Sequence, residues 1–215
     1  MLVLLRKVAI AVLLLSAINS LILRNFVFIW TGLVFCVVAY GSFTSSVRWA
    51  PGKNQKTGNI SALRLLVFLP YYVVVFCIMV YGFLNTHIRR LESYTKITDD
   101  VFVGDYFSSF MGFNTWKSIL DITNELPRVG KCSKYLNIQS WDGTPPSPAE
   151  IQCGVEFIRK CQKPVLVHCA HGKGRSVTMV VAYLRASGIC KSVPEAIQKV
   201  CTISTFHDYV HSASY

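Results

Sequence analysis

The chain has 215 residues and a formal net charge of +11, with 22 Lys and Arg against 11 Asp and Glu. Its apolar content of 52% is enough for a packed core and excludes a disordered chain. No basic patch is interleaved with aromatic residues, so we expect no nucleic-acid partner. The eight cysteines show neither CxxC pairs nor zinc spacing, and we therefore expect free cysteines, no metal and no cofactor.

The first 91 residues contain no Asp or Glu but nine Lys or Arg, so residues 1–91 carry +9 while residues 92–215 carry +2. Between these basic residues lie three apolar runs of 16, 22 and 24 residues, at 8–23, 26–47 and 65–88. The last two exceed the length that a helix needs to cross a bilayer core of roughly 30 Å, and the first is marginal. We therefore predict that residues 1–91 form a membrane anchor with two or three transmembrane helices in a lipid bilayer.

Residues 92–215 show strand patterns that alternate with helix patterns. We predict a hairpin at 97–107, helices at 108–117, 149–161 and 176–187, strands at 118–125, 135–138 and 164–168, and short closing helices after residue 191. Such alternation indicates an α/β domain with a central sheet flanked by helices. The predicted boundary between the anchor and this domain lies at residues 91 and 92.

The stretch VLVHCAHGKGRS, residues 165–176, joins a short apolar strand to a long apolar helix and bears two glycines. Unpaired N–H groups and the dipole at the start of a helix favour an anion above such a loop. The planar guanidinium of Arg175 matches two phosphate oxygens, and the same positive field favours the thiolate of Cys169. We predict a phosphate site with a nucleophile at its base.

His168, Cys169, Gly172, Arg175 and Ser176 occupy the five fixed positions of the pattern HCxxGxxRS. The chain therefore resembles the cysteine-dependent tyrosine and dual-specificity phosphatases, over about residues 95–215. The resemblance implies that Cys169 attacks phosphorus to form a phosphocysteine, that Arg175 binds the phosphoryl group, and that Ser176 donates a hydrogen bond to the departing sulfur. It implies that His168 orients the loop. The expected substrate-binding residues are His168, Ala170, His171, Gly172, Lys173, Gly174 and Ser176.

A cysteine phosphatase also needs an acid that protonates the leaving oxygen. Asp142 lies in the turn-rich segment QSWDGTPPSP, 27 residues before the cysteine, where related enzymes carry a mobile loop with an aspartate. An Asp-Gly pair also stabilises turns, so a structural role for Asp142 stays open. Asp121 and Glu125 are further candidates for the acid.

We predict an enzyme, a membrane-anchored phosphomonoester hydrolase of dual-specificity type. Lys173 adds a cation to the loop and the anchor would hold the site beside a bilayer, which favours a lipid phosphate such as a phosphoinositide or phosphatidylglycerophosphate. Ala170 argues against this, because similar lipid enzymes often have lysine there. The alternatives are a phosphotyrosine, phosphoserine or phosphothreonine protein phosphatase and a catalytically idle phosphate-binding scaffold. Since free cysteines need a reducing compartment, we expect the catalytic domain to face the cytosol or an organelle matrix.

Overall fold

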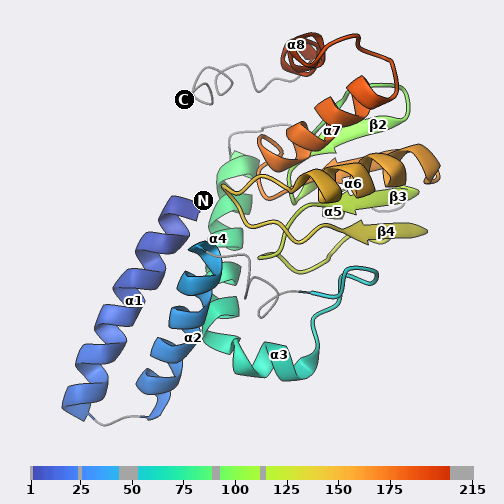
Figure 1. Cartoon of the computed structure of the whole chain (residues 1–215). Coiled ribbons are helices and arrows are strands. Elements are labelled where there is room, and N and C mark those ends of the chain that lie inside the picture. The colour runs from blue at the N-terminus through green and yellow to red at the C-terminus, as the bar shows by residue number, and fades with distance from the viewer. Residues whose placement is uncertain (1, 24–25, 44–52, 89–92, 112–114, 204–215) are drawn as a thin grey trace.

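The computed structural model describes residues 2–23, 26–43, 53–88, 93–111 and 115–203. An α/β domain occupies the second half of the chain, and long N-terminal helices stand beside it (Figure 1). This arrangement confirms the prediction of a central sheet flanked by helices.

A mixed five-stranded sheet forms the centre of the domain, in the order β1-β2-β5-β3-β4. Its strands are β1 (Tyr94–Lys96), β2 (Val101–Gly104), β3 (Ser118–Asp121), β4 (Lys134–Asn137) and β5 (Val165–His168). β1 is antiparallel to β2, and the other neighbours are parallel. The register pairs Gly104 with His168, His168 with Asp121, and Asp121 with Asn137, so four strands end at one edge of the sheet. Ligands bind at such an edge in open α/β sheets.

Two helices, α6 (Pro148–Lys160) and α7 (Arg175–Ala186), pack on one face of this sheet, and α8 (Val193–Ile203) packs against α7. A capping box between Ser147 and Glu150 starts α6, with Pro148 in its first turn. The predicted boundaries of α6 and α7 are correct to within one residue. The helix predicted at 108–117 is observed only as α5 (Ser108–Met111): residues 115–117 are not helical, and residues 112–114 lie outside the described residues.

Four helices precede the domain, α1 (Leu2–Leu23), α2 (Phe26–Phe43), α3 (Ala62–Val67) and α4 (Leu69–Ile88). α1 packs along α2, and α2 contacts α4, which lies next to the domain (Figure 1). Tyr71, Tyr72 and Val75 of α4 are buried in a cluster that includes Trp141 and Ala170 of the domain. Many large apolar side chains elsewhere on α1, α2 and α4 are exposed. The N-terminal helices therefore share a hydrophobic core with the loops that follow the sheet.

Among the described residues, no helix is both long and apolar enough to cross a membrane. This finding overturns the predicted transmembrane helices, and with them the localisation as an integral membrane protein whose catalytic domain faces the cytosol or a matrix. The lipid bilayer, predicted as a partner, has no support either. The prediction counted the lengths of apolar runs, but the run at 65–88 is divided between α3 and α4 at Phe68. The end of the run at 26–47 lies outside the described residues.

Candidate active site

The predicted phosphate loop lies at the carboxyl edge of the sheet, between the end of β5 and the start of α7. Gly174 is the N-cap of α7 and has no side chain that could satisfy the first N–H groups of the helix, an arrangement that suits an anion. Gly172 has a φ of 72°, and a Cβ there would lie 2.8 Å from the backbone carbon of Gly104. The loop therefore needs glycine where it packs against the end of β2.

Cys169 is 2% exposed and directly follows β5. Its Sγ lies 3.3 Å from Oγ of Ser176, which is fully buried in the first turn of α7. A hydroxyl at this distance can donate to a thiolate. The two residues have the relation that the phosphatase resemblance implies for nucleophile and hydrogen-bond donor.

Arg175 is 4% exposed, and its guanidinium is held by two carboxylates. Its Nη1 and Nη2 donate to the two carboxylate oxygens of Glu125 at 3.2 and 2.8 Å, and Nη2 also lies 3.2 Å from Oδ1 of Asp142. Burial opposes the charge, but the carboxylate of Glu125 raises the pKa of Arg175 above its ordinary value. Within the described part of the chain, Nε of Arg175 has no hydrogen-bond partner. Arg175 is thus a permanent cation with a buried N–H donor that has no partner among the described residues.

Asp142 lies in the turn that Gly143 completes with a φ of 80°. Its side chain is 20% exposed. Burial acts to raise its pKa, but Arg175 and His171 hold that pKa below the ordinary value. The rival carboxylates Asp121 and Glu125 are almost fully buried and are committed to ion pairs. Of these three carboxylates, Asp142 is the one with solvent access.

The remaining loop residues point in different directions. The side chain of Ala170 is buried in the cluster with Trp141, whereas His171 and Lys173 are exposed beside the loop. His168 is 2% exposed, and burial lowers its pKa. The structure therefore brings His168, the nucleophile and the arginine together, and leaves two side chains of the loop accessible to a substrate.

Two residues of this region were missed by the sequence analysis. Glu125 was considered only as an acid, but the structure shows that it holds Arg175. Lys53 was assigned to the anchor, but it pairs with Asp121 beneath the loop. Lys53 and Asp121 are 68 residues apart in the chain, so no local pattern could reveal their contact.

Residues 122–212 match a protein-family model described as "Swiss Army Knife protein, DSP-PTPase phosphatase domain". The match includes the Asp142 turn and the whole loop from His168 to Ser176. The chain therefore carries a phosphatase domain of the dual-specificity and tyrosine phosphatase type. It is an enzyme, a cysteine-dependent phosphatase of dual-specificity type, as the sequence predicted.

Several solved structures resemble about half of the chain. Tk-PTP in its active form is 24% identical, with 54% of this chain and 86% of that chain covered at a TM-score of 0.46. PTPMT1, also solved in complex with PI(5)P, is 26% identical, with 52% and 83% covered at a TM-score of 0.45. Human DUSP28 is 16% identical, with 52% of this chain and 81% of that chain covered at a TM-score of 0.44. At these TM-scores the likenesses support no conclusion about the substrate. Comparison with curated proteins finds no match.

Proposed function

We propose that the chain hydrolyses phosphomonoesters through a phosphocysteine at Cys169, with Arg175 as the phosphoryl-binding residue and Asp142 as the general acid. The observation that carries this proposal is the guanidinium of Arg175, which Glu125 holds in place while Nε stays unpartnered in the described structure. This N–H belongs to a planar donor group that suits two phosphate oxygens. It lies at the end of the loop that begins with the nucleophile.

In the first step, the thiolate of Cys169 attacks phosphorus and an S–P bond forms. The bond between phosphorus and the leaving oxygen breaks, and that oxygen takes the proton of Asp142. The three equatorial oxygens of the transition state are stabilised by Arg175 and by the N–H groups at the start of α7.

Asp142 must be protonated for this step, although Arg175 and His171 lower its pKa in the ligand-free site. A phosphoryl dianion on Arg175 competes with Asp142 for Nη2, which now lies 3.2 Å from the carboxylate. When the phosphoryl group displaces Asp142 from Nη2, the carboxylate loses its contact with the cation and gains a negatively charged neighbour. Both changes raise the pKa of Asp142. Substrate binding thus creates the acid that the reaction needs.

In the second step, Asp142 takes a proton from water and the resulting nucleophile attacks phosphorus. The S–P bond breaks, inorganic phosphate forms, and the sulfur leaves as a thiolate. Ser176 stabilises the departing charge from its position 3.3 Å away. No cofactor takes part in this cycle.

For the substrate, we favour a lipid phosphate such as a phosphoinositide or phosphatidylglycerophosphate. The support is Lys173, an exposed cation in the loop that adds to the attraction for a headgroup with several negative charges. The alternative, a phosphoprotein, is favoured by Ala170, which takes the position where similar lipid phosphatases often have lysine. The argument from a membrane anchor no longer applies.

The test is phosphate release by the full chain from short-chain phosphoinositides, short-chain phosphatidylglycerophosphate, and phosphotyrosyl and phosphoseryl peptides. Cys169→Ser should abolish release but retain binding of inorganic phosphate, because a serine hydroxyl stays protonated. Cys153→Ser, at an exposed cysteine of α6, should behave as the wild type. Turnover by Cys169→Ser at the wild-type rate would contradict the mechanism, and preference for peptides would contradict the lipid substrate. Phosphate binding by the wild type without turnover would identify a scaffold.

A further inference from the structure

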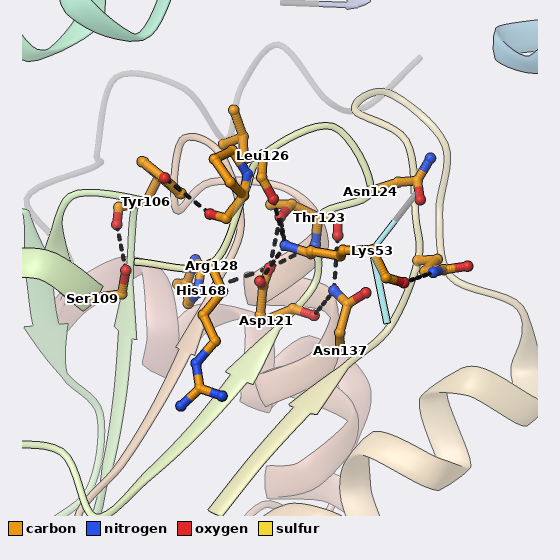
Figure 2. A network of polar contacts seen from close by, with 12 residues as sticks. Lys53, Tyr106, Ser109, Asp121, Thr123, Asn124, Leu126, Arg128, Asn137 and His168 are labelled. Carbon is orange, nitrogen blue, oxygen red and sulfur yellow. Dashed lines mark hydrogen bonds and ion pairs between the residues drawn. The ribbon is translucent and has the colours of Figure 1, made fainter. Parts of the chain in front are cut away.

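Lys53 is a buried lysine from the segment between α2 and α3, and its side chain has an exposed fraction of 0%. Its ammonium group donates to the carboxylate of Asp121, to Oγ1 of Thr123 at 2.9 Å and to the carbonyl oxygen of Leu126 at 2.6 Å. An ammonium has three N–H groups, so these acceptors satisfy it completely. Figure 2 shows this ammonium at the centre of a polar network.

The segment that carries Lys53 is held against the domain by several hydrogen bonds. The N–H of Asn137 in β4 donates to the carbonyl of Gln55 at 2.9 Å, and the side chain of Gln139 donates to the carbonyl of Lys53. Arg128 donates to the carbonyl of Thr57 at 2.8 Å. Backbone contacts therefore fix the position of the ammonium, which does not depend on the flexible lysine side chain alone.

Asp121 links this ammonium to the catalytic loop. It ends β3, and its register partner in β5 is His168, the residue before Cys169. Its Oδ1 lies 3.8 Å from Nε2 of His168, and its Oδ2 accepts a hydrogen bond of 2.6 Å from the hydroxyl of Tyr135. Among the described residues, Lys53 and His168 are therefore the two basic partners of one buried carboxylate (Figure 2).

We propose that Lys53 is a positioning residue of the phosphatase, which fixes Asp121 and thereby the orientation and charge of His168 beneath the nucleophile. This inference rests on the proposed function, because it assigns Lys53 a role in the reaction of Cys169. It adds a residue from outside the catalytic motif, contributed by the segment that precedes the matched domain.

The physical reason is the cost of an unpaired buried charge. If the ammonium is removed, Asp121 keeps a buried carboxylate whose nearest basic group is His168, and a buried charge takes up a proton or a new partner. Burial lowers the pKa of His168, Asp121 opposes this shift, and Lys53 and Arg175 add to it. Without Lys53 the pKa of His168 shifts upward, which favours the charged form of a ring that lies next to the nucleophile.

Other groups also face His168 and influence the protonation of its ring. The ring of Tyr106, which follows β2, lies 6.3 Å from the imidazole, and Nδ1 of His168 lies 3.5 Å from the carbonyl oxygen of Cys169. Among the described residues, the charged or titratable groups that act on the ring or line the cavity beside it are Asp121 of β3, Tyr135 of β4, Tyr106 after β2, Arg128, Arg175 of α7, and Lys53. Of these groups, Lys53 is the one that lies outside residues 92–215. Its substitution therefore tests the contribution of the N-terminal segment without changing a residue of the catalytic domain.

The experiment uses the full chain with the variants Lys53→Met, Asp121→Asn and the double variant. Lys56→Met is the matched control, since it removes an exposed lysine from the same segment. Two assays are run as a function of pH. The first measures kcat and KM on an aryl phosphate. The second measures the rate at which iodoacetamide alkylates Cys169, followed by mass spectrometry of the peptide that contains it.

We expect Lys53→Met to lower kcat about 10- to 100-fold with less than a threefold change in KM, because a small misplacement of reacting groups has such an effect. The pH at which alkylation reaches half its maximal rate should shift as well. The double variant should be no slower than Asp121→Asn, and Lys56→Met should match the wild type.

A folded Lys53→Met variant with wild-type kcat and a wild-type alkylation profile would overturn the inference. If Lys53→Met does not fold, the double variant decides, because it has no unpaired charge. If the folded double variant has wild-type kcat and wild-type alkylation, Lys53 only neutralises the charge of Asp121, and the inference is wrong. If the folded double variant has a lowered kcat, the result supports a positioning role for the pair. The two claims can fail separately. If the wild type hydrolyses no phosphate ester, the proposed function is wrong. If Lys53→Met still alters the alkylation of Cys169 in that case, the structural link between Lys53 and Cys169 stands.

Discussion

The ring of Tyr71 in α4 meets the ring of Trp141 edge to face, with centroids 6.4 Å apart. Trp141 directly precedes the proposed acid, Asp142. The hydroxyl of Tyr71 also donates to the backbone carbonyl of Glu125 at 3.5 Å, next to the carboxylate that holds Arg175. One buried side chain of an N-terminal helix thus contacts both segments that supply carboxylates to the site.

This contact predicts that Tyr71→Ala lowers kcat on alkyl phosphates about 10- to 100-fold, because the acid turn loses its packing partner. Tyr71→Phe keeps the ring and should stay within about threefold of the wild type, since a single hydrogen bond contributes little. Tyr81→Ala, on an exposed position of the same helix, is the control. A Tyr71→Ala variant with a wild-type circular dichroism spectrum and wild-type kcat would show that α4 has no influence on the acid.

The general-acid role predicts that Asp142→Asn reduces kcat about 10²- to 10⁴-fold on alkyl phosphates, whose leaving oxygen needs a proton. Aryl phosphates should slow far less, because a phenolate leaves without full protonation. The comparison of both substrate classes in steady-state assays checks this. Equal slowing of both would assign Asp142 a structural role.

Glu125 accepts from both Nη groups of Arg175, so its charge holds the guanidinium in place. Glu125→Gln should weaken the binding of inorganic phosphate about tenfold, measured by calorimetry in the Cys169→Ser background, because charge-assisted bonds are the stronger ones. Glu156→Gln is the matched control, since Glu156 makes an exposed pair with Lys160. Unchanged phosphate affinity in Glu125→Gln would mean that Arg175 keeps its position without this partner.

Asp105, which follows β2, predicts a pH dependence of stability. Burial raises its pKa to about 6, although Ser108 donates a backbone hydrogen bond of 2.9 Å to its carboxylate. The folded state therefore binds more protons than the unfolded state between about pH 4 and pH 6, and stability falls as the pH rises through this window.

Asp105→Asn removes this penalty and keeps the acceptor for Ser108. We expect the variant to have the Tm of the wild type near pH 4 and a Tm about 2–6 °C higher at pH 8, measured by thermal unfolding. Asp99→Asn serves as the control, because the carboxylate of Asp99 is 97% exposed. A gain at pH 8 no larger than that at pH 4 would contradict the expected direction.

The extent to which the sequence predicts this protein depends on the separation of the residues involved. The loop from Cys169 to Ser176 is predictable, because its nucleophile, glycines and arginine lie within one short segment at the N-terminus of a helix. The bounds of α6 and α7 follow from local patterns in the same way, whereas the hairpin predicted at 97–107 is formed by β1 and β2, Tyr94–Lys96 and Val101–Gly104. Glu125 and Lys53 were not assigned their partners, since these lie 50 and 68 residues away in the chain.

The error about the N-terminal segment has a related cause. The length and hydropathy of an apolar run do not show where a helix ends or which residues the faces of that helix contact. The break at Phe68 lies two residues before Pro70, whereas the burial of Tyr71 against Trp141 depends on the folded domain. Apolar residues that pack against a domain and those that face lipid have the same composition, so hydropathy cannot separate them.

The pairing of Lys53 with Asp121 also constrains the order in which the protein forms during synthesis. Lys53 leaves the ribosome before all of its side-chain partners, and the strand that binds its segment follows about 80 residues later. Its ammonium must stay hydrated until β3 and β4 have been made, because a buried charge needs its acceptors. Closing so long a loop comes late in folding and slows it. A substitution near the N-terminus can thus reduce the yield of active enzyme by delaying the completion of a site encoded more than a hundred residues downstream.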